Sequence, residues 1–184
     1  MSDYRRWFVE GGTVFLTLVS YNRRPILTSE YGRRFLRLAI GDARVRLPFE
    51  IVATVLLPDH WHVVMRLPQG DCGYSARIRK IKIEFSKRWI SAGLAEAEVT
   101  SSQHERGYRG IWQPRFWEHT VRDESDLERC CDYIHWNPRK HDLVARVSEW
   151  RWSSFHRFVE MGHYAIDWGG TAPRSVNGAD FGEP

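Results

Sequence analysis

Residues 55–66 read Val-Leu-Leu-Pro-Asp-His-Trp-His-Val-Val-Met-Arg, and the predicted fold is built outward from them. An apolar run breaks at Pro58-Asp59, a pair typical of turns, and resumes with alternating residues, so we predict two strands of a hairpin. Alternation in the second strand puts His60 and His62 on one face and Trp61 on the other. Neutral imidazoles bind divalent ions, so the pair is a candidate metal site. A pair of histidines near a strand end more often belongs to a solvated polar face, so the pair alone does not decide between a metal site and such a face.

Periodicity on both sides of this hairpin predicts further strands and helices. β-branched and aromatic residues after Gly11-Gly12 predict a first strand, and three- to four-residue apolar spacing predicts two amphipathic helices with cations on their outer faces. The segment 91–110 is small and polar, and we expect a mobile loop there. Pro138 is expected to stop or bend the helix that precedes it. The predicted order is strand 13–20, helix 31–45, strand 49–57, strand 60–67, helix 73–90, strand 116–121, helix 126–136 and a short helix that starts within 150–155.

This order predicts an α+β fold of the ferredoxin-like split-βαβ type, with an antiparallel sheet and helices on one face. The chain has 184 residues, of which 42% are hydrophobic, enough for one domain with a sizeable core. We predict that the domain spans residues 1–161. Composition then shifts to Gly, Pro, Asp and Asn, so residues 162–184 are expected to form a weakly ordered tail.

Composition points to an anionic partner. The 27 Lys+Arg residues exceed the 23 Asp+Glu residues, and nine tryptophans lie among them. Basic residues interleaved with aromatics suit single-stranded nucleic acid, on whose bases aromatic rings stack. Residue by residue, a buried tryptophan and a solvated arginine are the commoner explanations. The three cysteines form no disulfide framework, and no signal peptide or membrane span is found, so we expect a soluble cytoplasmic protein without membrane contact.

A second candidate half-site lies in Asp132-Tyr133-Ile134-His135-Trp136-Asn137-Pro138. Tyr133 and Asn137 are four residues apart and share a helical face, if Pro138 leaves the helix intact. A phenol is a nucleophile and an amide oxygen is a ligand, so with His60 and His62 they would form a three-ligand site for Mg²⁺ or Mn²⁺. The spacing alone favours a simpler reading, a tyrosine near a helix end followed by an Asn-Pro turn.

Taken together, these motifs resemble those of the REP-associated tyrosine transposases, HUH single-tyrosine enzymes related to insertion-sequence transposases. The resemblance implies the HUH endonuclease fold, with His60 and His62 as paired metal ligands, Asn137 as third ligand and Tyr133 as nucleophile. Asp142 departs from the family, which often has glycine there. The motifs that carry the resemblance are Tyr4-Arg5-Arg6, Gly11-Gly12-Thr13, Leu57 to His62, Ile111-Trp112-Gln113, Phe116 to His119, Tyr133 to His141, Trp152 to Phe155 and Asp167 to Gly170.

The resemblance implies that Tyr133 attacks a backbone phosphate of single-stranded DNA, leaving a 5′-phosphotyrosine link and a free 3′-hydroxyl. A free tyrosine, with a pKa of about 10, is ionised only about once in a thousand molecules at pH 7. The activating group is therefore an open question. His135 projects from another face of the helix and is a poor base, while His119 and the metal ion are the alternatives.

The expected partner is a REP-type single-stranded DNA hairpin with an adjacent tetranucleotide. Two rival readings stay open: a non-cleaving REP hairpin-binding protein, and a structural domain stabilised by zinc. The chain could act as a monomer or as a homodimer, with Tyr133 serving its own subunit or the other. The expected DNA contacts are Tyr4, Arg5, Arg6, Arg23, Arg24, Arg77, Arg79, Lys80, Arg139 and Lys140.

Overall fold

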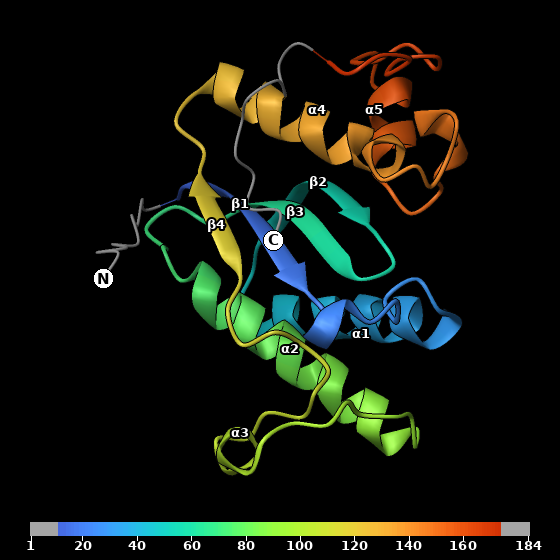
Figure 1. Ribbon diagram of the computed structural model, residues 1–184. Coiled ribbons are helices and arrows are strands. Elements are labelled where there is room, and N and C mark those ends of the chain that lie inside the picture. Colours follow the sequence, from blue (N-terminus) through green and yellow to red (C-terminus); the bar gives the residue numbers. More distant parts are fainter. Residues whose placement is uncertain (1–10, 174–184) are drawn as a thin grey trace, which may run out of the picture.

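The structure is a computed structural model that describes residues 11–173 of the chain. Four antiparallel strands form one sheet in the order β2-β3-β1-β4, with helices packed around it (Figure 1). Among the described residues, no helix combines the length and the apolar character needed to span a bilayer. The elements are β1 (Thr13–Val19), the 3-10 helix η1 (Tyr21–Arg23), α1 (Glu30–Arg46), β2 (Glu50–Leu56), β3 (His60–Arg66), α2 (Tyr74–Ser91), α3 (Ser101–Glu105), β4 (Trp117–Thr120), α4 (Glu124–Lys140), the 3-10 helix η2 (Val147–Glu149) and α5 (Phe155–Glu160).

The strand order is that of a split βαβ fold. β3 lies between β1 and β2 and pairs antiparallel with both, while β4 extends the sheet on the other side of β1. The hairpin turn closes at Pro58-Asp59, where the Leu57 N–H donates to the His60 carbonyl at 2.9 Å. The predicted α+β class and the antiparallel sheet are therefore confirmed.

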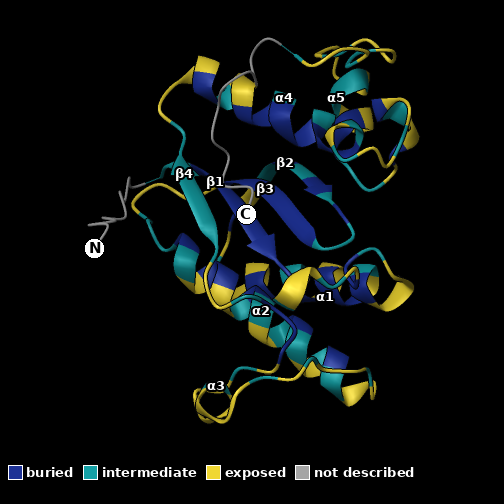
Figure 2. Cartoon of the chain, in the orientation of Figure 1, coloured by how far each residue is buried: buried dark blue, intermediate teal, exposed yellow. Residues whose placement is uncertain are grey.

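Helices cover both faces of the sheet, whereas the sequence predicted helices on one face only. α1 and α2 pack on the face that carries Trp61 and Met65, and α4 packs on the face that carries Val64 (Figure 1). Every residue of β3 except Arg66 is buried (Figure 2). Because apolar side chains project from both faces, a single layer of helices would leave Val64 and Phe15 in water.

α4 extends further than predicted. The side chain of Asp123 caps its first turn and accepts a hydrogen bond from the Asp126 N–H at 2.8 Å. The helix then continues through Pro138 to Lys140, although proline was expected to stop or bend it. Proline deprives the helix of one backbone N–H donor. Because Pro138 is itself buried, its packing offsets that loss.

A short helix, α3, interrupts the segment 91–110 that was predicted to be a loop. It begins with a capping box, in which Thr100 Oγ1 accepts from the Gln103 N–H at 3.2 Å and Gln103 Oε1 accepts from the Thr100 N–H at 3.0 Å. The Tyr21 hydroxyl donates to the same Oε1 at 3.2 Å and ties α3 to η1. The Thr-x-x-Gln spacing is a helix-start signature that could have predicted this turn.

After α4 the chain returns to the outer edge of β2. The Ser154 N–H donates to the Thr54 carbonyl at 2.8 Å, and the Leu56 N–H donates to the Trp152 carbonyl at 2.8 Å. Residues 152–154 therefore act as a short additional strand. They cover backbone groups that would otherwise remain unpaired at this edge.

The described part of the predicted tail, residues 162–173, makes specific contacts. The Tyr164 hydroxyl donates to Asp132 Oδ1 at 2.7 Å, and the Tyr164 ring lies 4.4 Å from that of Trp168, measured between centroids. These contacts join the segment to α4. The division between domain and tail at residue 162 stays a prediction.

Candidate functional site

His60 and His62 begin β3 and project toward α4. Their side chains are buried, with 2% and 0% exposure, and their ring centroids are 4.7 Å apart. His60 Nδ1 lies 2.7 Å from Asp59 Oδ1, and His62 Nδ1 lies 2.9 Å from Thr17 Oγ1. Each ring is thus held through Nδ1, which turns Nε2 away from the supporting side chain.

The surroundings of His60 fit a metal ligand. Its Nε2 atom is buried, and no hydrogen-bond partner for that atom exists among residues 11–173. Buried polar atoms in proteins normally have a partner, and a divalent cation would be one here. The carboxylate behind Nδ1 is the usual support of a metal-binding histidine. His60 therefore has the surroundings of a ligand to a divalent cation.

Asp59 is ionised beside this pair. Burial raises the pKa of its carboxyl group, but the hydrogen bond and charge of His60 and the charge of Arg23 outweigh burial, so the pKa lies below its ordinary value. Arg23 donates to Asp59 Oδ2 at 2.9 Å. Fixed from both sides, the carboxylate orients the imidazole and makes it a stronger electron donor toward a cation.

One face of α4 lies against the histidine pair. Tyr133, Asn137 and His141 follow at four-residue intervals and share this face, since the helix is unbroken at Pro138. The Tyr133 ring centroid is 5.4 Å from that of His62, and the His141 ring centroid is 5.2 Å from that of His60. Asn137 has no exposed surface. The candidate nucleophile and the two candidate histidine ligands thus come together within one chain, and Asn137 lies on the same helix face as Tyr133.

Three residues of this site had no assigned role in the sequence analysis. His141 continues the four-residue period of the tyrosine helix and could have been found from it. Asp59 was treated only as a turn residue, although a carboxylate next to a histidine is a signal in itself. Thr17 lies opposite His62 in the β1–β3 register, a pairing over 45 residues that periodicity does not reveal.

Lys140 contacts the candidate nucleophile. Its Nζ donates to the Tyr133 hydroxyl oxygen at 3.4 Å and lies 5.0 Å from the centre of the Tyr133 ring. From the sequence, this lysine was expected either to contact DNA phosphates or to be a favourable charge at the helix C-terminus. A cation so placed favours the phenolate over the phenol.

His135 and His119 are both engaged elsewhere. His135 has no exposed surface, and its Nε2 lies 2.8 Å from Ser154 Oγ. Burial, helped by the charge of Arg157, lowers the pKa of His135 to about 3. His119 Nε2 lies 2.8 Å from Asp126 Oδ2, a contact that ties β4 to the start of α4. Neither contact directs a base toward the tyrosine.

His119, Asp126 and Cys130 form a cluster whose potential ligand atoms all lie within 4.8 Å of one another. The Asp126 carboxylate already accepts hydrogen bonds from His119, from the Arg122 N–H at 3.0 Å and from Arg129 at 3.0 Å. Burial raises the pKa of the Cys130 thiol, which disfavours the thiolate that a metal requires. The cluster is a hydrogen-bonded network and contains none of the predicted ligands.

Arg77 was expected to contact DNA, but it is a structural residue. Its side chain is 1% exposed, forms an ion pair with Asp71 at 2.6 Å and donates to the Pro48 carbonyl at 2.7 and 3.1 Å. These partners consume its donors. Arg77 therefore anchors α2 and does not reach solvent.

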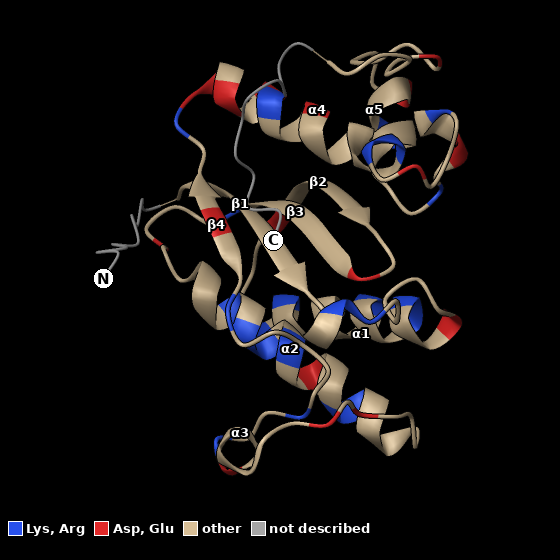
Figure 3. Cartoon of the chain, viewed as in Figure 1, with Lys and Arg blue, Asp and Glu red and all other residues tan. Residues whose placement is uncertain are grey.

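Other predicted contacts differ widely in availability. Lys and Arg residues are spread over α1 and α2 (Figure 3), and Arg79 on α2 is exposed. Tyr4, Arg5 and Arg6 lie outside the described residues. Two of the expected contacts form ion pairs with carboxylates, Arg23 with Asp59 and Lys80 with Glu84. Three others contact groups of the protein: Arg24 donates to the carbonyls of Ala95 and Gly110, Arg139 donates to the Gly169 carbonyl, and Lys140 lies against Tyr133.

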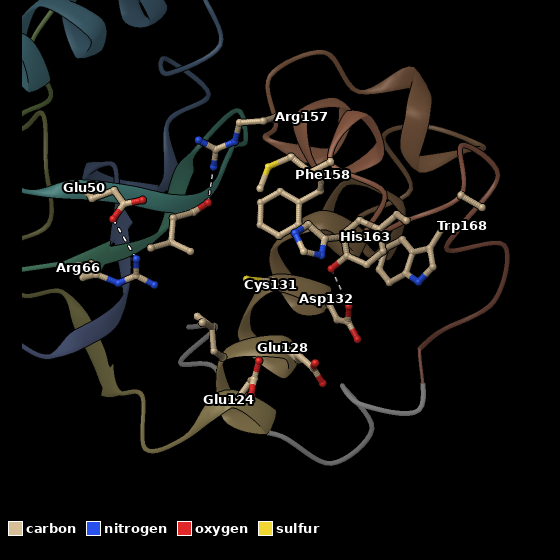
Figure 4. Close-up of a pocket in the computed structure, with 15 residues that line it drawn as sticks. Glu50, Arg66, Glu124, Glu128, Cys131, Asp132, Arg157, Phe158, His163 and Trp168 are labelled. Atoms are coloured by element: carbon tan, nitrogen blue, oxygen red, sulfur yellow. Dashed lines mark hydrogen bonds and ion pairs between the residues drawn. The ribbon is translucent and has the colours of Figure 1, made fainter.

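A cavity of about 630 Å³ lies between α4, α5 and β2 and is lined by neither histidine of the pair (Figure 4). The carboxylates of Glu124, Glu128 and Asp132 line it, together with aromatic rings that include Phe158 and Trp168. Arg66 and Arg157 line it as well, so the charge of its wall is mixed. The cavity is separate from the candidate site, because neither His60 nor His62 lines it.

Comparison with known proteins identifies the family to which this chain belongs. Residues 9–137 match the family described as transposase IS200 like. The chain is 44% identical over 171 residues to the REP-associated tyrosine transposase of Escherichia coli (strain K12), covering 92% of each. It is 41% identical over 180 residues to a REP-associated tyrosine transposase assigned in Haemophilus influenzae, covering 97% of this chain and 99% of that protein. A solved structure of a REP-associated tyrosine transposase bound to a REP hairpin superimposes with a TM-score of 0.76 and 42% identity over 94% of both chains. The chain therefore belongs to the IS200-like transposase family and, within it, to the REP-associated tyrosine transposases.

Proposed function

We propose that this protein cuts and rejoins single-stranded DNA beside REP-type hairpins, with Tyr133 as the nucleophile. The observation that carries the proposal is the contact of Tyr133 with the histidine pair, at 5.4 Å between its ring centroid and that of His62. Because both halves come from one chain, the tyrosine can serve its own subunit. The hairpin enters as partner because a relative of 42% identity was solved with a REP hairpin.

His60, His62 and Asn137 would hold Mg²⁺ or Mn²⁺ in this mechanism. The buried Nε2 atom of His60 and the supporting carboxylate of Asp59 favour a cation at this point. When bound, such an ion polarises the scissile phosphate, a contribution of several kcal/mol. His141 lies close enough to His60 to help shape the site.

In the cleavage step the Tyr133 oxygen forms a bond to phosphorus and the bond from phosphorus to the 3′ oxygen breaks. The leaving oxygen takes a proton from water and becomes a free 3′-hydroxyl, while the 5′ phosphate stays on the tyrosine. The covalent link conserves the phosphodiester energy. Attack by a 3′-hydroxyl on the phosphotyrosine then reverses the step and rejoins DNA without ATP.

Lys140 would stabilise the phenolate form of Tyr133 after the phenol proton has passed to water. A free tyrosine at pH 7 faces a deficit of roughly 4 kcal/mol for ionisation. Lys140 is exposed, so solvent screens its charge and we assign it about 1 kcal/mol, or roughly fivefold in rate. That leaves roughly 3 kcal/mol of the deficit to be met by groups other than Lys140.

The test uses a labelled hairpin oligonucleotide with a single-stranded flank and MnCl₂. We expect Tyr133→Phe to abolish covalent protein–DNA adducts while hairpin binding in gel shifts stays within a few-fold of wild type. Adducts formed equally by Tyr133→Phe would remove this tyrosine from the mechanism. Hairpin binding by the wild type without any adduct would favour the rival reading of a non-cleaving binding protein.

A matched pair of variants tests the lysine. Lys140→Met should slow adduct formation about fivefold at pH 7, and Lys140→Arg should restore most of the rate because it keeps the charge. The deficit of Lys140→Met should shrink as the pH rises toward 9, where more tyrosine ionises unaided. A deficit that is the same at every pH would assign Lys140 to DNA binding alone.

A further inference from the structure

A groove of about 700 Å³ lies between α1 and residues 151–157, alongside β2. Its lining contains no Asp or Glu residue. Five arginines line it instead, three from α1 and two from the C-terminal segment, and we call it the arginine groove: Arg33, Arg37, Arg44, Arg151 and Arg157.

The charges of this groove are not neutralised within the described part of the chain. Among residues 11–173, none of the five guanidinium groups forms an ion pair with a carboxylate. Arg33 donates to the Thr28 carbonyl and Arg157 donates to the carbonyls of Ile51 and Val52, contacts that position these two side chains without neutralising their charge. Three of them lie over aromatic rings, Arg33 at 4.9 Å from Trp152, Arg44 at 5.0 Å from Phe49 and Arg157 at 5.7 Å from Phe158. Mutual repulsion of five like charges is relieved when an anion enters. By contrast, the arginines paired with carboxylates are Arg23, Arg66, Arg77, Arg88, Arg109 and Arg129.

The dimensions suit a polyanion with regularly spaced charges. Arg33 and Arg44 are eleven residues apart on α1, which corresponds to about 16 Å along the helix. One strand of duplex DNA presents about five phosphates over that length. The two arginines of residues 151–157 supply the opposite wall, and Thr54 and Ser153 also line the groove.

The groove offers little for reading bases. Trp152 is its most accessible aromatic ring, and Arg33 already lies over it. Trp61 also lines the groove, but it is 2% exposed and its Nε1 donates to Thr54 Oγ1. Without an exposed aromatic ring on which a base could stack, the guanidinium groups are suited to contacts with the sugar-phosphate backbone of DNA.

The groove lies close to the candidate active site but on the other face of the sheet. Trp61 lines the groove, while its neighbours His60 and His62 project to the face that α4 covers. The scissile phosphate at Tyr133 therefore cannot occupy the groove at the same time. DNA in the groove must be a segment that flanks the cut.

We propose that the arginine groove binds the phosphate backbone of DNA flanking the cleaved phosphate, independently of base sequence. This inference rests on the proposed function for the identity of the DNA. A paired hairpin stem and an unpaired flank present the same phosphate chemistry. The experiment below distinguishes these two sources.

The test compares two double variants that lose the same charge. Arg37→Ala/Arg151→Ala removes two groove arginines, and Arg34→Ala/Arg46→Ala removes two exposed arginines of α1 outside the groove. Dissociation constants are measured by fluorescence anisotropy between 50 and about 300 mM NaCl. The probes are a hairpin without a flank and an unpaired oligonucleotide of the same length. Thermal melting by circular dichroism verifies that all proteins are folded.

We expect the groove variant to bind one of the two probes more weakly at about 0.1 M salt. If that probe is the hairpin duplex, the loss should be roughly sixty-fold and the slope of log K against log salt should fall by about 1.8; if it is the unpaired oligonucleotide, the loss should be roughly twenty-five-fold and the slope should fall by about 1.4. The control variant should change affinity by less than about fivefold. The probe that loses affinity identifies stem or flank as the ligand.

The proposal would be refuted if the two double variants lost the same affinity for DNA, or if the groove variant bound both probes as tightly as wild type. This result is separable from failure of the proposed function. Wild-type protein that shows the groove-dependent binding but forms no Tyr133 adduct would support the groove while refuting cleavage. If Tyr133 forms adducts but DNA affinity does not depend on the groove arginines, the proposed function would be supported and the groove refuted.

Discussion

The carboxylate of Asp59 should control how tightly His60 and His62 hold a divalent cation. It lies 2.7 Å from His60 Nδ1 and is ionised, so their contact is a charge-assisted hydrogen bond that fixes the ring. Losing such a support behind a metal-binding histidine typically weakens metal affinity 10- to 100-fold, or about 1.4 to 2.7 kcal/mol. Asp59→Ala removes both the hydrogen bond and the charge, and we expect a loss near the upper value. Asp59→Asn keeps an acceptor without the charge, and we expect about tenfold.

Isothermal titration of each protein with MnCl₂ measures this effect directly and needs no DNA. Arg23→Gln is the matched control, because Arg23 is the other partner of Asp59 and its side chain is 41% exposed. We expect that variant to bind Mn²⁺ within about twofold of wild type. Urea unfolding of all variants checks that the hairpin turn survives. If Asp59→Ala binds Mn²⁺ as tightly as wild type in the folded state, the reasoning from ring orientation to metal affinity is wrong.

Three further predictions concern stability. Gly32→Ala should lower the free energy of unfolding by about 3 kcal/mol or more, because the new Cβ would lie 2.1 Å from the Ile26 carbonyl oxygen. Gly41→Ala on the same helix is the control: its Cβ would meet nothing within 4 Å, so it should raise the free energy of unfolding, measured with urea, by about 0.5–1 kcal/mol. Arg77→Met should cost about 3 kcal/mol in the same assay while hairpin affinity per folded molecule stays within about twofold. Burial raises the pKa of Asp126, but hydrogen bonds from the Arg122 N–H, His119 and Arg129 outweigh it and lower the pKa overall. Asp126 therefore contributes stability above its unfolded pKa of about 4 that disappears as the pH falls through the lower folded value, and the destabilisation by Asp126→Asn should shrink between pH 5 and pH 2.5.

The part of the fold that follows from local pattern was predictable. Alternation along β3 assigned His62 and Trp61 to opposite faces, and the structure places one against the tyrosine helix and the other in the core under α1 and α2. The four-residue period from Tyr133 to Asn137 likewise predicted a shared face, which the unbroken helix preserves. These patterns follow from the two-residue period of a strand and the 3.6-residue period of a helix, which can be recognised from a few neighbouring residues.

Other features could not be predicted because they depend on partners far along the chain. Arg77 has the same sequence signature as an exposed helix arginine, and only the Pro48 carbonyl, 29 residues away, reveals that it is buried. Coverage of the second sheet face could not be predicted from helix periodicity, because an apolar stripe does not specify which face it covers. The arginine groove joins α1 to residues more than 100 positions later, and composition alone shows only a surplus of cations.

The pairing of residues 152–154 with β2 also has a consequence for biosynthesis. Ser154 and Thr54 are 100 positions apart, so the ribosome completes the strand long before it makes the segment that covers its edge. At typical elongation rates of about 5–20 residues per second, the edge stays open on the nascent chain for roughly 5–20 seconds. During that interval neighbouring nascent chains on one messenger can pair edge to edge, and a chaperone that shields the strand would raise the yield of native protein.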